Sequence, residues 1–207
     1  MKPLTTILFS ALITIPFTSC ESKKETTVTP ELTDPQKAEI IAQGNKASAA
    51  LFGELVPKLQ TAMKSGGPEK AITVCKEVAQ TTTLHTSKNF PDLTITRISD
   101  RTRNPVNQAD TADQSVLNDW ETLIKKGQLL PEATVKVSDH QSAIYYKPIM
   151  VGEVCLKCHG DPSTFTDGLS QQLKSLYPED QATGYKLGEL RGAFRVELPN
   201  HESNGSK

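Results

Sequence analysis

The residues with the clearest chemistry lie near position 155. Cys155-Leu156-Lys157-Cys158-His159 has the form Cys-x-x-Cys-His, which is the attachment pattern of c-type haem. Two thiols at this spacing reach the two vinyl groups on one porphyrin edge and form thioether bonds with them. The adjacent histidine then lies under the iron and supplies an axial imidazole. The sequence therefore predicts one haem c, attached through Cys155 and Cys158, with His159 as the proximal ligand.

Paired cysteines also occur in zinc sites and in thiol-disulfide motifs. A structural zinc site needs a second pair of ligands at short spacing, and the sequence has none. A thiol-disulfide motif needs neither the histidine that follows nor a bound cofactor. Haem attachment explains all three residues together.

Cys20 follows an apolar N-terminal segment. Lys2 supplies a positive charge, and residues 4–17 form a mostly apolar run of about fourteen residues. This run is too short to span a bilayer and is typical of a signal-peptide core. Phe17-Thr18-Ser19-Cys20 resembles the lipoprotein cleavage box, so we expect a signal peptide at 1–19 and acylation of Cys20. The protein would then be exported and lipid-anchored to a membrane of the bacterial cell envelope; a plain secretory signal with an incidental Cys20 is the alternative.

Cys75 is the cysteine that remains, and it has no disulfide partner left. An unpaired thiol in an oxidising compartment calls for an explanation. It can be a small apolar residue on the buried face of its helix, or it can be the second axial ligand of the iron. Other side chains could also serve as that ligand: His85, His140, His201, Met63 and Met150. The residue types alone leave this choice open.

Three arginines and two tyrosines are further candidates for the haem site. Arg97, Arg101 and Arg103 lie near a predicted loop and could bind haem propionates through bidentate hydrogen bonds. Structural salt bridges in a solvated loop are the alternative. Tyr145 and Tyr146 precede the haem motif, and strand alternation sends them to opposite faces of the sheet. Tyr146 could therefore line the haem pocket, with ordinary sheet packing as the other possibility.

The elements that must position these residues begin with helices. Asp34 can cap a helix that has Pro35 in its first turn, and apolar residues follow at helical spacing. Pro57 is expected to kink or split this helix. Gly66-Gly67-Pro68 should end it and begin a second helix, which carries Cys75.

Strands dominate the second half of the predicted fold. The patterns indicate strands at 93–98, 134–138, 143–149 and 194–198, helices at 116–124 and 168–176, and a loop at 100–111. Helices followed by strands that pair antiparallel give an α+β fold. The expected organisation is a flexible tether at 20–34, one haem domain at 35–199 and a polar tail at 200–207.

The composition excludes several classes of protein. A chain of 207 residues is enough for one ordinary domain with attachments. The formal net charge of −1 produces no field that would attract nucleic acid, and 5% aromatic residues argue against a base-stacking surface. No nucleic-acid partner is predicted.

Several segments between Ala38 and Val196 together resemble a known family. They include Ala71-Ile72-Thr73-Val74-Cys75, Arg97, Arg103-Asn104-Pro105-Val106-Asn107, Tyr146-Lys147-Pro148-Ile149, the haem motif through Pro162, residues 177–185 and residues 190–194. In these segments the chain resembles a family of exported single-haem c-type proteins long catalogued as a domain of unknown function. Similar domains also occur as haem sensor modules of histidine kinases and chemotaxis receptors.

The resemblance implies a PAS-like antiparallel sheet with N-terminal helices, and His/Cys axial ligation with Cys75 as the distal ligand. A thiolate ligand favours ferric iron and can be labile on reduction. The expected function is therefore a redox or small-ligand haem sensor that acts on an unknown redox or signalling protein of the envelope. An envelope electron-transfer cytochrome is the alternative. An enzyme such as a peroxidase is not expected, because no histidine is convincingly placed as a distal acid-base group.

Overall fold

The computed structural model describes residues 31–138 and 142–198. The predicted signal peptide, Cys20, most of the tether, His140 and the tail with His201 lie outside the described residues.

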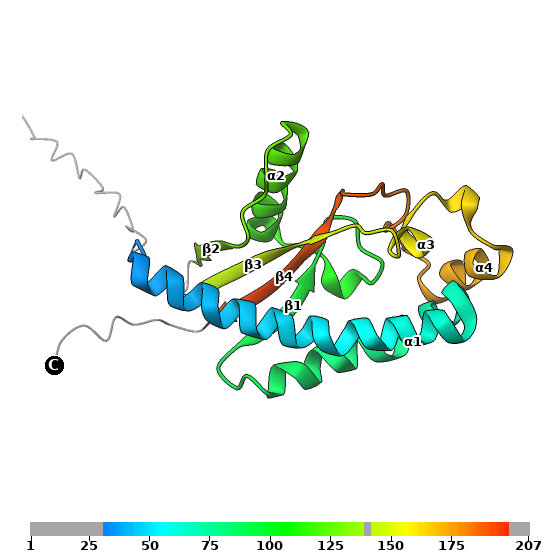
Figure 1. Cartoon of the computed structure of the whole chain (residues 1–207), viewed down its shortest axis with the longest axis horizontal. Coiled ribbons are helices and arrows are strands. Elements are labelled where there is room, and N and C mark those ends of the chain that lie inside the picture. The colour runs from blue at the N-terminus through cyan, green and yellow to red at the C-terminus, as the bar shows by residue number, and fades with distance from the viewer. Residues whose placement is uncertain (1–30, 139–141, 199–207) are drawn as a thin grey trace, which may run out of the picture.

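A long helical segment, α1 (Asp34–Lys88), begins the described chain and consists of two helices. Thr33 rather than Asp34 is its N-cap, and the Thr33 backbone N–H donates to Gln36 Oε1 at 2.9 Å. Figure 1 shows that the second half of α1 folds back beside the first. Lys58 Nζ on the first half donates to Thr82 Oγ1 on the second at 3.2 Å.

The break in α1 lies at the glycines and not at the proline. Gly67 has φ 66°, in the left-handed region that favours glycine, and its ψ of −161° turns the chain out of the helical path. The helix continues through Pro57, so the predicted split at that residue is wrong. A proline removes one backbone hydrogen bond and crowds the preceding turn, whereas two consecutive residues with non-helical angles redirect the backbone.

Four antiparallel strands form the sheet in the order β1-β4-β3-β2. Their bounds are β1 (Thr94–Ile98), β2 (Thr134–Val137), β3 (Ala143–Met150) and β4 (Leu190–Leu198). The strands predicted at 134–138 and 143–149 are confirmed as β2 and β3, which pair antiparallel. β4 pairs with both β1 and β3, so the last described strand is a central one.

Helices cover both faces of this sheet (Figure 1). The first half of α1 packs Ile40, Ala47 and Leu51 against one face. On the other face, α2 (Thr111–Lys125) packs Val116, Leu117 and Trp120. The mixture of helices with one antiparallel sheet confirms the predicted α+β class.

Short helices gather at one end of the sheet, beside the second half of α1 (Figure 1). They are the 3-10 turns η1 (Pro105–Asn107) and η2 (Pro162–Thr164), the single turn α3 (Leu156–His159), and α4 (Asp167–Leu176). Leu169 and Leu173 of α4 pack with Ile72 of α1 and with Tyr177. None of the helices in the described ranges combines the length and the apolar character needed to cross a membrane.

Candidate cofactor site

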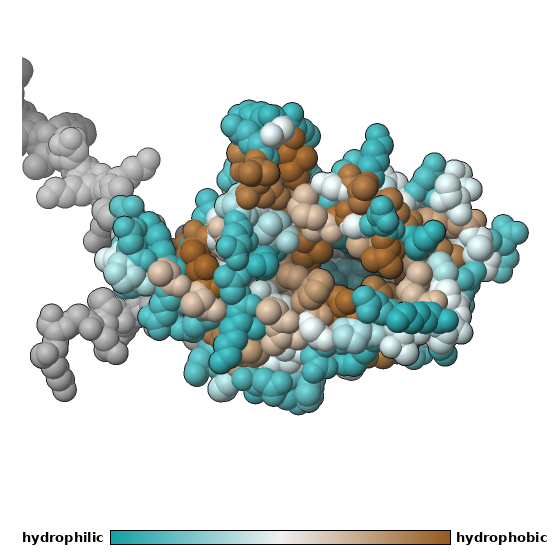
Figure 2. Space-filling model, in the orientation of Figure 1, coloured by the Kyte–Doolittle hydropathy of each residue, from teal (hydrophilic) through white to brown (hydrophobic). Residues whose placement is uncertain are grey.

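One cavity brings together Cys75 and the Cys-x-x-Cys-His motif. Its volume is about 330 Å³, which is within the usual range for ligand and cofactor pockets. Cys75 reaches it from the second half of α1, and Cys155, Cys158 and His159 reach it from α3 and the residue before α3. Figure 2 shows a hollow on this face of the molecule with hydrophobic residues around it. Apolar side chains supply much of its wall, among them Leu55, Leu59, Ile72, Ile149 and Val154.

The motif is wound into one helical turn. His159 N–H donates to the Cys155 carbonyl at 2.9 Å, and Cys158 N–H donates to the same carbonyl at 3.2 Å. Positions i, i+3 and i+4 share one side of a helix, so the two thiols and the imidazole line the same cavity. Gly160 ends the turn, and a Cβ at that position would clash with the Leu156 carbonyl oxygen.

The His159 ring is oriented by a backbone carbonyl. Its Nδ1 lies 2.6 Å from the Ala182 oxygen. A carbonyl can only accept, so Nδ1 carries the proton and Nε2 keeps its lone pair, as in histidines that bind metals. Burial, reinforced by Arg103, lowers the pKa of His159 well below its ordinary value, and the ring is therefore neutral. Tyr185 packs edge-on against it, with ring centroids 6.2 Å apart.

Residues 180–185 run along the motif and hold it in place. Tyr185 N–H donates to the His159 carbonyl at 2.9 Å, and Gly184 N–H donates to the Gly160 carbonyl at 2.7 Å. Gly184 has φ 73°, a conformation suited to glycine. This segment therefore supplies both the backbone support of α3 and the carbonyl that orients the histidine.

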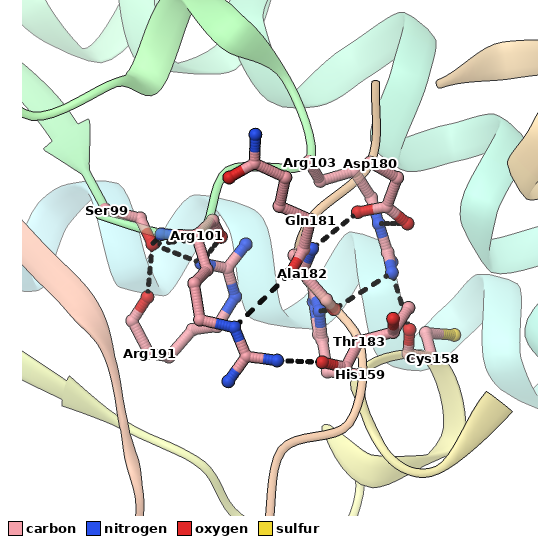
Figure 3. A network of polar contacts seen from close by, with 10 residues as sticks. All are labelled: Ser99, Arg101, Arg103, Cys158, His159, Asp180, Gln181, Ala182, Thr183 and Arg191. Carbon is pink, nitrogen blue, oxygen red and sulfur yellow. Dashed lines mark hydrogen bonds and ion pairs between the residues drawn. The ribbon is translucent and has the colours of Figure 1, made fainter. Parts of the chain in front are cut away.

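Arg103 lines the cavity, but its guanidinium already makes hydrogen bonds to other groups of the protein. Figure 3 shows its guanidinium between Asp180 and the motif. Nε pairs with Asp180 Oδ2 at 3.0 Å, and Nη2 donates to the carbonyl of Cys158 at 2.6 Å and to that of Ala182 at 3.3 Å. The sequence left two roles open for Arg103, a contact to a haem propionate or a structural salt bridge, and the structure shows the salt bridge.

Arg97 lines the same cavity and has a different environment. Its Nε is buried, and no hydrogen-bond partner for it is found among the described residues. Burial lowers the pKa of Arg97, and the nearby Cys75 thiol opposes that shift. A buried N–H that has no hydrogen-bond partner among the described residues is costly, which fits an anionic group bound in the cavity.

Of the other two arginines in this region, Arg101 is a candidate for a haem contact from the sequence and Arg191 is not. Arg101 does not line the cavity: its guanidinium stacks on the Tyr185 ring, 4.0 Å from the centroid, and donates to the Thr183 carbonyl. Arg191 does line the cavity, and its Nη1 donates to Ser99 Oγ at 2.8 Å. Arg191 was not among the predicted site residues. An arginine inside the otherwise apolar 190–194 segment was the available signal for it.

Only some of the candidates for a second axial ligand line the cavity. Cys75 is half-buried and packs with Cys158 against Ile72 and Tyr177. Burial raises the pKa of the Cys75 thiol, and the positive charges of Arg103 and Arg97 counteract this rise. Met63 and Met150 also line the cavity, whereas His85 is exposed on α1 and does not.

Tyr146 lies away from the cavity, so its predicted role in the haem pocket is wrong. Its hydroxyl donates to Asp113 Oδ1 at 2.8 Å under α2, and burial raises its pKa. Tyr145 faces α1 instead and donates to Asn45 Oδ1 at 2.7 Å. The predicted alternation is confirmed, but both faces of the sheet at this point are filled by helices.

The described residues fit a covalently attached haem. Two thiols and a neutral imidazole occupy one helical turn, and a third thiol faces the same apolar cavity. In addition, the buried Nε of Arg97 has no hydrogen-bond partner among these residues. Cys155 and Cys158 could hold the macrocycle, His159 Nε2 and Cys75 could hold the metal, and Arg97 could hold a carboxylate. The fold and the site define a class: an α+β protein with one cavity built around a Cys-x-x-Cys-His turn.

The comparisons place the chain within a particular family of that class. A family model described as Tll0287-like matches residues 28–199. The chain therefore belongs to the Tll0287-like family, which confirms the family resemblance found in the sequence. A solved structure described as "Crystal structure of the cyanobacterial heme-protein Tll0287" is similar with a TM-score of 0.58 and 20% identity. The similarity covers 82% of this chain and 98% of that chain. A comparison with curated proteins found no match.

Proposed function

We propose that this protein carries one haem c, attached to Cys155 and Cys158 with His159 and Cys75 as axial ligands, and that it is a redox or small-ligand sensor. The observation that carries the proposal is the convergence of Cys75 and the Cys-x-x-Cys-His turn on one cavity. A structural relative described as a heme-protein supports the cofactor. When bound, the haem supplies one-electron redox chemistry and an iron site for small ligands.

The residues have distinct tasks in this proposal. His159 offers Nε2 because Ala182 holds its Nδ1 proton. Cys75 offers a thiolate that stabilises the oxidised metal. Arg97 holds a propionate with its Nε, for which residues 31–138 and 142–198 offer no hydrogen-bond partner. The apolar walls exclude water, which strengthens these electrostatic interactions.

A sensor is favoured because the same cavity contains alternative donors. Met63 and Met150 line it together with Cys75, and a thioether suits reduced iron better than a thiolate does. Reduction could then exchange Cys75 for a methionine or open a position for a small ligand. An electron-transfer cytochrome is the second candidate, and it is supported by the exposure of Val154 (53%) and Met150 (40%) at the cavity, which brings this part of the site near solvent.

The deciding experiment uses optical and EPR spectra of the purified protein, oxidised and reduced. We expect a low-spin thiolate signature in the wild type that is lost in Cys75→Ala, while the haem stays attached. Met150→Ala is the matched control, because it removes another sulfur from the same cavity and should leave the oxidised spectrum unchanged. An unchanged Cys75→Ala spectrum would clear Cys75 of the axial role. Ligand exchange on reduction would support a sensor, and rapid electron exchange without it would support a carrier.

The proposal also includes the place of the protein in the cell. Export, a lipid anchor at Cys20, a redox or signalling partner in the bacterial envelope and the absence of an enzymatic activity are all part of it. The support is the N-terminal sequence pattern and the need of c-type haem for attachment outside the cytoplasm.

A further inference from the structure

Arg103 and Asp180 form a buried ion pair next to the histidine. Their side chains are only 8% and 9% exposed, and the Nε–Oδ2 distance is 3.0 Å. Desolvating two charges costs about as much as their attraction returns unless further hydrogen bonds complete the pair. Backbone groups around His159 supply these further hydrogen bonds.

Both members of the pair bind the backbone of Ala182, one at its N–H and the other at its carbonyl. Asp180 Oδ1 accepts from the Ala182 N–H at 2.8 Å, and Arg103 Nη2 donates to the Ala182 carbonyl at 3.3 Å. That carbonyl also accepts from His159 Nδ1 at 2.6 Å. Arg103 binds the motif directly as well, through the Cys158 carbonyl at 2.6 Å. Figure 3 shows this chain of contacts from Asp180 to His159.

We propose that Arg103 and Asp180 are positioning residues that orient His159 through the backbone of Ala182 and set the potential of the metal bound to it. This inference rests on the proposed function. Outer partners of a metal-bound histidine fix its ring orientation and tune its donor strength. Hydrogen bonds and charges beside the axial ligand are also among the levers that set a haem potential.

The two charges act on the potential with opposite signs. Arg103 competes with His159 for the Ala182 oxygen, and its positive charge disfavours the oxidised metal. Both effects raise the potential, so losing Arg103 lowers it. The negative charge of Asp180 favours the oxidised metal, so losing Asp180 raises the potential.

The test uses the full-length haem-loaded protein and three variants: Arg103→Gln, Arg103→Lys and Asp180→Asn. The readouts are the potential from spectroelectrochemistry, the EPR g values and the thermal midpoint. At a fixed electrode potential, Arg103→Gln should lower the ratio of reduced to oxidised protein by about tenfold, which corresponds to about 59 mV for one electron. Asp180→Asn should raise that ratio. Arg103→Lys keeps the charge and should largely restore the potential while changing the g values.

Arg195→Gln is the matched control. It breaks another ion pair, between half-buried Arg195 (Nε) and buried Asp113 (Oδ1) at 3.1 Å, on the face of the sheet that α2 covers. It should lower the thermal midpoint and leave the potential and the g values unchanged.

Two results would overturn the inference. In one, Arg103→Gln and Asp180→Asn shift the potential in the same direction. In the other, they shift it no more than Arg195→Gln does and leave the g values unchanged. If Arg103→Gln does not fold, the sign of the Asp180→Asn shift and the g values of Arg103→Lys decide. A wild type without a haem spectrum overturns the proposed function as well, whereas a His-ligated haem that is insensitive to these variants overturns this inference alone.

Discussion

Two arginines at the cavity differ in what binds them. Arg103 is satisfied by Asp180 and two carbonyls, whereas the buried Nε of Arg97 has no hydrogen-bond partner within residues 31–138 and 142–198. Removing one partner of a satisfied buried pair leaves the other charge uncompensated. Removing a charge that has no partner relieves a desolvation cost. The effect on stability of substituting each arginine should therefore depend differently on whether the cavity holds haem.

Arg97→Gln is predicted to destabilise only the loaded protein. In the haem-loaded form it should lower the free energy of unfolding by about 1–3 kcal/mol, because a propionate loses its charged donor. In a Cys155→Ala/Cys158→Ala background without attached haem, the same change should be neutral or stabilising. Denaturant unfolding of the four proteins measures both effects. Equal destabilisation in the two backgrounds would show that Arg97 has only a structural role.

The residues of the motif were predictable because their chemistry depends on local spacing. Cys155, Cys158 and His159 are neighbours in sequence, and one helical turn places them together. The ion pair of Arg103 with Asp180 joins segments that are distant in sequence, and no local pattern signals it. Tyr146 is a second example. Strand alternation predicts that Tyr146 and Tyr145 lie on opposite faces of the sheet, but the contacts of Tyr146 depend on the position of α2, which the sequence does not reveal.

At the scale of elements, the junction of β1 and β4 has no room for a side chain at Gly192. Its φ is 145°, and a Cβ would clash with the Ile98 carbonyl oxygen. β1 carries Arg97 and β4 begins with Leu190 and Arg191, so this close approach brings both arginine-bearing segments to the cavity.

Gly192→Ala is predicted to lower the free energy of unfolding by about 2–3 kcal/mol, because the new methyl group strains the backbone and separates the strands. Gly53→Ala is the control. Gly53 is exposed on α1, and a methyl group there would meet no atom within 4 Å other than those of its chain neighbours and its own helix backbone. Alanine at this position should therefore stabilise by about 0.5–1 kcal/mol. Denaturant titrations compare the two variants. A Gly192→Ala protein as stable as the wild type would contradict the packing at this junction.

Elements were predicted well where the signal was periodic and poorly where it depended on a single residue. The alternation along β4 and the apolar stripe of α2 each specify one face that must be buried, and both elements are confirmed. Pro57 is a local signal that the rest of α1 overrides, because apolar residues on both sides of it keep packing against the sheet and the cavity. The N-cap of α1 is Thr33, one residue before the predicted Asp34, because Thr33 forms the capping hydrogen bond with Gln36.

For the whole molecule, the class of fold followed from the order of its elements. Helices come first and antiparallel strands later, which leaves few arrangements other than α+β. The path by which the second half of α1 returns to the cavity was not predictable, because it depends on the dihedral angles of Gly66 and Gly67.

The association of the whole molecule with a membrane is predicted to depend on Cys20. Cys20→Ser should remove fatty-acid labelling and move the protein from the membrane fraction to the soluble fraction of the cell envelope. Because the change is at the expected lipidation site and far along the sequence from the haem motif, the haem spectrum should be unchanged. Fractionation and metabolic labelling test this, and a Cys20→Ser protein that stays in the membrane fraction would contradict the lipid anchor.

The strand order has a consequence for the sequence of events during biogenesis. β4 is the last described strand to leave a ribosome or an export channel, yet it is the only strand that pairs with β1 within the described sheet. Until β4 arrives, the β2–β3 hairpin stands alone, and the cavity lacks the wall formed by Arg191 and Phe194. Under the proposed function, Cys155 and Cys158 are therefore accessible to the haem-attachment machinery before β4 has paired and completed the cavity. A haem attached at that stage would be enclosed when β4 inserts and completes the cavity that Cys75 lines.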